Sequence, residues 1–211
     1  QPLGHGLVHG ELRVQRRGRV LRHELHLTPV RPQAALAGGQ RAHQAGRAGA
    51  DLLAAPVAAA IAALPSARVA EIDPELADTA AFCETYDVLP EASANCVVVE
   101  GRRREQTTRA AVLVLATDRA DVNKTVRKHL GVRKVSFADQ SSTEEATGMT
   151  SGGITPIGLP GEWPVLVDQA VATAEWVVIG GGVRGSKLLA SGAELAALPG
   201  AEVLDLTIPA A

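Results

Sequence analysis

A glycine-rich stretch near the middle of the chain constrains its fold more than any other feature. Between Thr147 and Gly158 the sequence holds four glycines and one proline, so neither a helix nor a regular strand can continue through it. Met149, Ile154 and Ile157 are nevertheless apolar, which indicates a loop held against a core. This central loop either joins two elements as a tight turn or presents backbone N–H groups to a ligand as an anion or oxyanion pocket.

Apolar periodicity predicts short strands interspersed with helices. Strands are expected over residues 68–72, 95–100, 109–116, 132–137, 163–168, 175–179 and 202–206, and the main helices over residues 51–64, 78–86, 121–131 and 141–147. The second and third strands flank a charged segment and predict a hairpin. Because few regular βα units occur, the pattern favours a mixed sheet in an α+β domain.

Charge is distributed unevenly along the chain. Residues 1–50 contain eight Arg and two Glu, a net charge of +6, and their glycine content predicts a disordered basic extension. Residues 51–211, expected to form one folded domain, contain 13 basic and 21 acidic residues. An acidic domain is not a general nucleic-acid binder, so contact with RNA would require a local basic patch. Lys124 and Lys128, near Arg133 and Lys134, form the best candidate, the alternative being a solvated surface.

The reactive residue types argue against conventional hydrolytic machinery. Cys83 and Cys96 form no CxxC pair, which favours reduced thiols in a cytoplasmic protein over a zinc site or a disulfide. His129 is the one histidine after residue 43 and lies on the apolar face of its expected helix, as is typical of a core residue. Ser151 therefore has no evident base, and we expect no metal, no cofactor and no membrane span.

Residues Gly180–Gly185 form a second glycine-rich loop, which satisfies the pattern GxGxxG. A dinucleotide site also requires a helix of ordinary length after the loop, but only six residues separate Gly185 from Gly192. Nucleotide binding at this loop is one hypothesis. The other is a second backbone wall of a pocket shared with the central loop, with Arg184 near phosphate or carbonyl oxygens.

Three segments together resemble one family. Residues 152–158, GGITPIG, resemble the GGISPLG loop of the YbaK family, also called the prolyl-tRNA synthetase-associated domain. Residues 121–135 resemble its helix and following strand, and residues 181–185, GGVRG, resemble its second loop, usually GGKRG. The resemblance covers residues 68–205. It implies a mixed, strongly curved sheet with flanking helices, and a hydrolase that deacylates mischarged tRNA, with the acceptor end of aminoacyl-tRNA as its partner.

The resemblance also implies a mechanism without a protein nucleophile. The aminoacyl ester lies against backbone N–H groups of the GxxxP loop and is attacked by water or by the substrate's own side chain. Catalysis is then carried by Gly152, Gly153, Ile154, Thr155 and Pro156. Substrate contacts are expected from Gly158, Asp168, Gly181, Gly182, Arg184, Lys124 and Lys128.

One departure from the family separates two hypotheses. Editing members carry a lysine in the strand that begins here at Ala94, and alignment places Asn95 at that position; Val183 likewise replaces the lysine of GGKRG. Asparagine can hydrogen-bond an ester or a ribose but supplies no positive charge. The chain is therefore either an active aminoacyl-tRNA deacylase with Asn95 as a polar partner, or a catalytically inactive tRNA- or ligand-binding module of the same fold.

Overall fold

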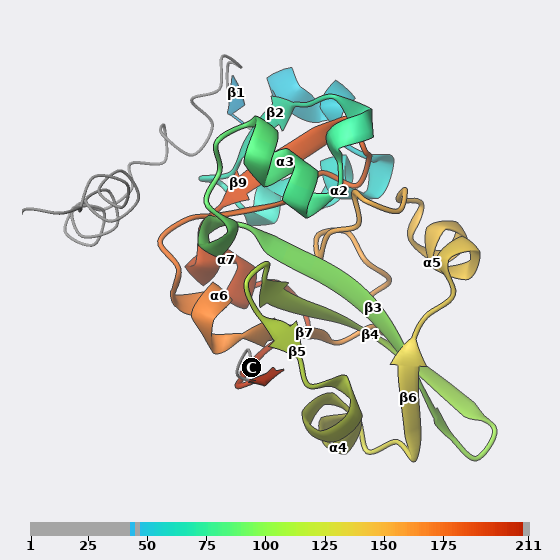
Figure 1. The fold of residues 1–211 in the computed structure, drawn as a ribbon. Coiled ribbons are helices and arrows are strands. Elements are labelled where there is room, and N and C mark those ends of the chain that lie inside the picture. Colours follow the sequence, from blue (N-terminus) through green and yellow to red (C-terminus); the bar gives the residue numbers. More distant parts are fainter. Residues whose placement is uncertain (1–42, 45–46, 209–211) are drawn as a thin grey trace, which may run out of the picture.

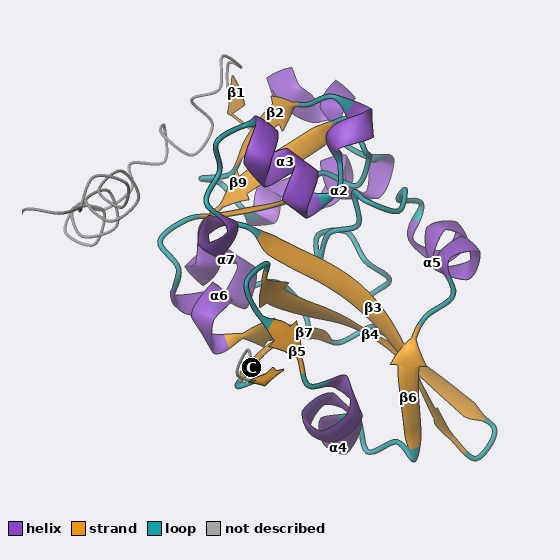
Figure 2. Cartoon of the chain, viewed as in Figure 1, coloured by secondary structure: helices purple, strands orange, loops and turns teal. Residues whose placement is uncertain are grey.

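The computed structural model describes residues 43–44 and 47–208. Within them, two β-sheets share one apolar core, and short helices cover their outer faces (Figures 1 and 2). The boundary expected at residue 50 falls inside the 3-10 helix η1 (Arg47–Leu52). The rest of the expected extension lies outside the described residues, apart from the short strand β1 (His43–Gln44).

The larger sheet is mixed, as expected for an α+β domain. Its strand order is β10 (Ala201–Leu204), β7 (Val165–Asp168), β4 (Gln106–Leu115), β3 (Ala94–Arg103) and β6 (Lys134–Phe137). The hairpin β3–β4 and the pair β3–β6 are antiparallel, whereas β4–β7 and β7–β10 are parallel. The strands β5 (Arg119–Ala120) and β11 (Thr207–Ile208) form a separate pair.

The smaller sheet has the order β1, β2 (Arg68–Glu71), β9 (Ser186–Ala190) and β8 (Val177–Gly180), and all its pairs are antiparallel. The second glycine-rich loop joins β8 to β9. Apolar periodicity did not predict β9, because Ser186 and Lys187 interrupt the apolar pattern at its start. All five of its residues are nevertheless buried.

Aspartate caps explain where several helices begin. The side chains of Asp78, Asp121, Asp139 and Asp168 accept backbone N–H bonds at the starts of α3 (Thr79–Thr85), η5 (Val122–Val126), α5 (Gln140–Thr147) and α6 (Gln169–Thr173). The remaining helices are η2 (Ile61–Ala63), η3 (Pro74–Leu76), η4 (Pro90–Ala92), α4 (Arg127–His129), α7 (Gly192–Ala196) and α2 (Ala55–Ala60). None of the described helices is long and apolar enough to cross a membrane.

Two helical expectations need correction. Residues 51–64 do not form one helix: η1 ends at Leu52 and α2 begins at Ala55, because Pro56 in the first turn of α2 cannot continue a helix from η1. His129 is not a core residue: it lies at the surface, with Nε2 3.1 Å from a carboxylate oxygen of Glu202. Its helix opens with the π-helical turn η5, and such a turn rotates the following residues away from the face that an α-helical period predicts.

Candidate functional site

The central loop lies between α5 and the second glycine-rich loop, and hydrogen bonds hold it on both sides. The Thr150 N–H donates to the Gly182 carbonyl at 2.9 Å, and the Gly182 N–H donates to the Gly153 carbonyl at 2.7 Å. On the other side, the Ser151 N–H donates to a carboxylate oxygen of Glu144 at 2.8 Å. This bond holds the pKa of Glu144 below its usual value. The loop is therefore tied to the fold at several points.

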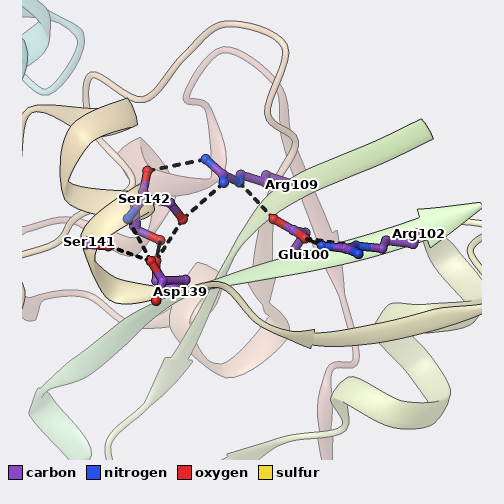
Figure 3. A network of polar contacts seen from close by, with 7 residues as sticks. Glu100, Arg102, Arg109, Asp139, Ser141 and Ser142 are labelled. Atoms are coloured by element: carbon purple, nitrogen blue, oxygen red, sulfur yellow. Dashed lines mark hydrogen bonds and ion pairs between the residues drawn. The ribbon is translucent and has the colours of Figure 1, made fainter. Parts of the chain in front are cut away.

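Helix α5, which carries Glu144, is itself anchored to the hairpin (Figure 3). The Arg109 guanidinium in β4 donates to the Ser142 hydroxyl at 3.1 Å and lies 3.3 Å from a carboxylate oxygen of Glu100 in β3. At the helix start, Asp139 accepts the Ser142 N–H at 2.9 Å. The support of the central loop thus extends into the larger sheet.

Two glycines allow the two loops to approach one another. A Cβ on Gly153 would lie 2.3 Å from the carbonyl oxygen of Val183, and a Cβ on Gly180 would lie 2.3 Å from the carbonyl oxygen of Gly153. Backbone atoms on both sides leave no room for a side chain. The glycines at these positions therefore serve the contact between the loops.

Two unpaired backbone amides of the loop face one cavity. The Gly153 N–H donates to the Thr150 carbonyl at 2.9 Å, whereas the N–H groups of Gly152, Ile154 and Thr155 have no acceptor among the described residues. Gly152 and Ile154 both line a cavity of about 270 Å³, whereas Thr155 is fully buried and does not line it. Gly152 and Ile154 are therefore the expected donors of the GxxxP segment.

The second loop explains the orientation of both free amides. The Ser151 carbonyl and the Gly152 N–H belong to the same peptide unit, and this carbonyl accepts a hydrogen bond from Arg184 Nη1 at 3.4 Å. The Gly153 carbonyl and the Ile154 N–H likewise belong to one peptide unit, and this carbonyl accepts the hydrogen bond from the Gly182 N–H. In a trans peptide the N–H and the C=O point in opposite directions. Both N–H groups therefore point away from the second loop.

Other central-loop residues lie away from this cavity. Thr155 is fully buried, and its hydroxyl has no hydrogen-bond partner among the described residues. Pro156 and Gly158 line a different hollow of about 350 Å³, beside Trp163. Gly158 has a φ of 75°, and a Cβ there would lie 2.3 Å from the Pro56 carbonyl oxygen, so its glycine is required by packing.

The opposite wall of the cavity comes from the starts of β3 and α3. Asn95 lines it, and its Oδ1 accepts a hydrogen bond from the Thr79 hydroxyl at 2.7 Å. That bond leaves the Asn95 amide nitrogen as a donor for a ligand. Cys96 also lines the cavity, but burial of its sulfur raises the pKa of the thiol to about 12. It is therefore a neutral thiol near pH 7 and a poor nucleophile.

A buried lysine completes the cavity, and the sequence patterns did not identify it. Lys187 in β9 is 6% exposed, and its Nζ donates to the Ala77 carbonyl at 3.0 Å. The same nitrogen lies 5.1 Å from the centre of the Phe82 ring. Burial lowers the pKa of Lys187. The available signal was a single charged residue next to an apolar run, which is unusual in a buried strand unless the charge has a role.

Arg184 and Gly182 support the central loop from behind, whereas the Gly181 carbonyl accepts the Ala54 N–H at 3.2 Å. Arg184 also donates through Nε to the Pro74 carbonyl at 3.1 Å, so its guanidinium bridges η3 and the central loop. Of the second loop, Gly180 is the residue that lines the cavity. A strand, β9, follows the loop directly, so the helix that a dinucleotide fingerprint requires is absent here.

Asp168, Lys124 and Lys128 are not brought to this cavity. Asp168 is 3% exposed, and its two carboxylate oxygens accept the N–H groups of Ala170 and Leu206, each at 2.9 Å. These bonds cap α6 and fix the chain after β10, which leaves no oxygen directed at a substrate. Lys124 and Lys128 lie in η5 and α4, at the opposite end of the molecule from α3 and β9 (Figure 1).

Asp168→Ala is expected to lower the free energy of unfolding by about 2–4 kcal/mol, since it removes a helix cap and leaves the buried Leu206 N–H without an acceptor. Urea unfolding monitored by tryptophan fluorescence measures this change. Asp168→Asn, which keeps one carbonyl oxygen, should lose about half as much. A variant as stable as the wild type would show that these two hydrogen bonds contribute little.

A larger hollow of about 710 Å³ adjoins the cavity. Asp78, Thr79 and Asn95 line both spaces, and Cys83, Val88 and Pro90 line the larger one alone. Together they offer a donor-rich part, formed by the free amides and Lys187, and a larger adjoining space. Within the described residues, no group of three His, Cys, Asp or Glu side chains could hold a metal ion.

Comparisons with known proteins agree with this architecture. Residues 73–198 match the model of a family described as the aminoacyl-tRNA editing domain. A crystal structure of a candidate trans-editing enzyme for prolyl-tRNA synthetase is similar with a TM-score of 0.63 and 22% identity, over 74% of this chain and 97% of that one. The hypothetical protein APE2540 is similar with a TM-score of 0.60 and 22% identity, over 67% of this chain and 91% of that one. At these identities the two structures support the fold alone.

Proposed function

Because this chain belongs to the aminoacyl-tRNA editing domain family, we propose that it hydrolyses the ester bond of mischarged aminoacyl-tRNA. The observation that carries the proposal is the cavity itself. Two free backbone amides, of Gly152 and Ile154, line the same cavity as the buried ammonium of Lys187. Such a set of donors suits the carbonyl oxygen of an ester, which becomes negatively charged during hydrolysis.

In the proposed reaction, the two amides hold the ester carbonyl oxygen while water attacks the carbonyl carbon. A new C–O bond forms, and the negative charge moves to the carbonyl oxygen, where the amides stabilise it. The bond to the ribose oxygen then breaks, and that oxygen leaves with a proton taken from the attacking water. The amino acid is released as a carboxylate, and the second proton of the attacking water passes to solvent. One such donor contributes about 3–4 kcal/mol to stabilising the transition state.

Lys187 supplies the positive charge of the proposed site. The lysine of the editing members is matched here by Asn95 in β3, and Lys187 reaches the same cavity from β9. Asn95 then acts as a neutral donor to the ester or the ribose. Neither Ser151 nor Cys96 serves as a nucleophile in this scheme, since His129, the histidine of the described domain, lies at the surface beside Glu202.

The inactive module is the second candidate function, and Asn95 in place of the family lysine favours it. A panel of tRNAs, each charged with a non-cognate amino acid, separates the two. We expect the protein to release at least one amino acid much faster than spontaneous hydrolysis does. Binding of tRNA without release of any amino acid would support the inactive module and refute the hydrolase.

A further inference from the structure

Positive charge in the domain is concentrated in one segment. Of the 13 basic residues in 51–211, ten lie in residues 100–137, together with four acidic residues, so this segment has a net charge of +6. The other residues of 51–211 contain three basic and 17 acidic residues, a net charge of −14. Two of those three basic residues are Arg184 and Lys187, which support the cavity. Such a separation of charge orients the molecule in the field of a polyanion.

The fold brings this segment together at one end of the molecule, here named the basic end: the tip of the β3–β4 hairpin, η5, α4 and β6 (Figure 1). Arg102 in β3 lies opposite Lys134 in β6, and the Arg133 N–H donates to the Arg102 carbonyl at 3.2 Å. Val132, which follows α4, packs against Gly101, where a Cβ would lie 2.8 Å from it. The hairpin tip and the helix therefore form a continuous surface.

Most cations of the basic end are available to a partner. Arg102 and Arg109 pair with Glu100, and Arg127 donates to its own helix. Six basic side chains of the basic end are exposed and make no ion pair with any described residue: Arg103, Arg104, Lys124, Lys128, Arg133 and Lys134. The tenth basic residue of the segment, Arg119, lies in β5, outside the basic end. Phe137 in β6 is 65% exposed and adds an aromatic surface beside them.

We propose that the basic end binds the phosphate backbone of the acceptor stem of the tRNA, which rests on the proposed function. Dispersed Lys and Arg side chains bind phosphates without reading sequence. A protein partner fits less well, because the cores of protein interfaces are depleted in charged residues, especially lysine.

The distance along β3 determines which part of the tRNA the basic end meets. Arg103 at the hairpin tip is eight positions after Asn95 at the cavity, which is about 26 Å at the usual rise of a strand. A terminal nucleotide whose ester lies in the cavity cannot also reach the hairpin tip. The basic end therefore contacts the paired stem, which it recognises by backbone and shape.

Neutralising three of the free cations tests the proposal: Arg103→Gln, Lys128→Gln and Lys134→Gln in one protein. A control protein carries Arg68→Gln, Gln169→Glu and Ala193→Glu. These substitutions change the net charge by the same amount but lie away from the basic end. Fluorescence anisotropy measures the Kd for uncharged tRNA between 50 and 200 mM salt. We expect the triple variant to bind at least about tenfold more weakly at low salt, with the slope of log K against log salt reduced by about three. The control should stay within about twofold to threefold of the wild type.

A short substrate separates this proposal from the proposed hydrolysis. The triple variant should hydrolyse 3′-aminoacyl-adenosine, which has no stem, at the wild-type rate. Unchanged tRNA binding by the triple variant would overturn the proposal and indicate another partner, such as an acidic protein. Equal losses in the triple variant and the control would also overturn it. If the wild type hydrolyses neither substrate but the triple variant still loses tRNA binding, the hydrolase fails and the binding surface stands.

Discussion

Lys187→Met should lower the kcat/KM of ester hydrolysis by about 100-fold or more, which is the effect typical of removing one group that stabilises charge in a transition state. The ammonium lies inside the cavity, is 6% exposed and has one hydrogen-bond partner, the Ala77 carbonyl, among the described residues. Single-turnover rates on the tRNA identified by the panel measure the loss. Arg68→Met, which removes a cation from the neighbouring strand β2, is the matched control and should retain activity.

The unfolding free energy of Lys187→Met distinguishes a functional role from a structural one. Since burial lowers the pKa of Lys187, the folded protein binds this proton less well than the unfolded chain does. The free energy of unfolding therefore falls as pH drops below the usual lysine range and the buried side chain takes up its proton. At neutral pH, the charged side chain opposes folding. We expect the methionine variant to be at least as stable as the wild type. A variant that is inactive because it unfolds would contradict this expectation.

The pH profile tests the charge state that the mechanism requires. The pKa of Lys187 is lowered by burial and also by Arg184, while Cys83 and Asp78 act in the opposite direction. If the ammonium is the active form, hydrolysis above the spontaneous rate should decline as pH rises through this lowered pKa, below the ordinary 10.5. The decline should be absent in Lys187→Met. Activity that instead rises through this range, and does so only in the wild type, would assign Lys187 as a neutral base.

Gly153→Ala should be the most disruptive change in the loops. Its Cβ would lie 2.3 Å from the oxygen and 2.5 Å from the carbon of the Val183 carbonyl, so two backbones must move apart. Overpacking of this kind costs about 1–3 kcal/mol or more in unfolding free energy. It also displaces the Gly152 and Ile154 amides, and a displacement of about 1 Å can lower the rate about 100-fold.

Gly161→Ala provides the matched control for this prediction. A Cβ on Gly161 meets no atom within 4 Å, so unfolding free energy should change by less than about 0.5 kcal/mol. Chemical unfolding and deacylation rates per folded molecule measure both variants. If Gly153→Ala unfolds like the wild type and retains its rate, the two loops are not held in the close contact described here.

The order of elements and the fold class could be predicted from the sequence, because local patterns encode them. Apolar runs rich in β-forming residues marked β3 and β4, and the helix expected from residue 121 does begin at the cap of Asp121. The sequence also located both glycine-rich loops and indicated Asn95 as a candidate residue, which lines the cavity. It did not predict β9, because a buried strand that starts with Ser186 and Lys187 breaks the apolar pattern.

What the tertiary structure decided is which groups of the site are free to act. The sequence alone indicated a rigid central loop with backbone amides, but every amide in it was an equal candidate. Contacts with a segment distant in the chain orient the free amides: Gly182 holds the Gly153 carbonyl, and Arg184 holds the Ser151 carbonyl. Likewise, only the packing of β9 against α3 brings Lys187 into the cavity, and only the contact with Leu206 engages Asp168. Hydrogen-bond partners depend on distance in space, which local sequence patterns do not specify.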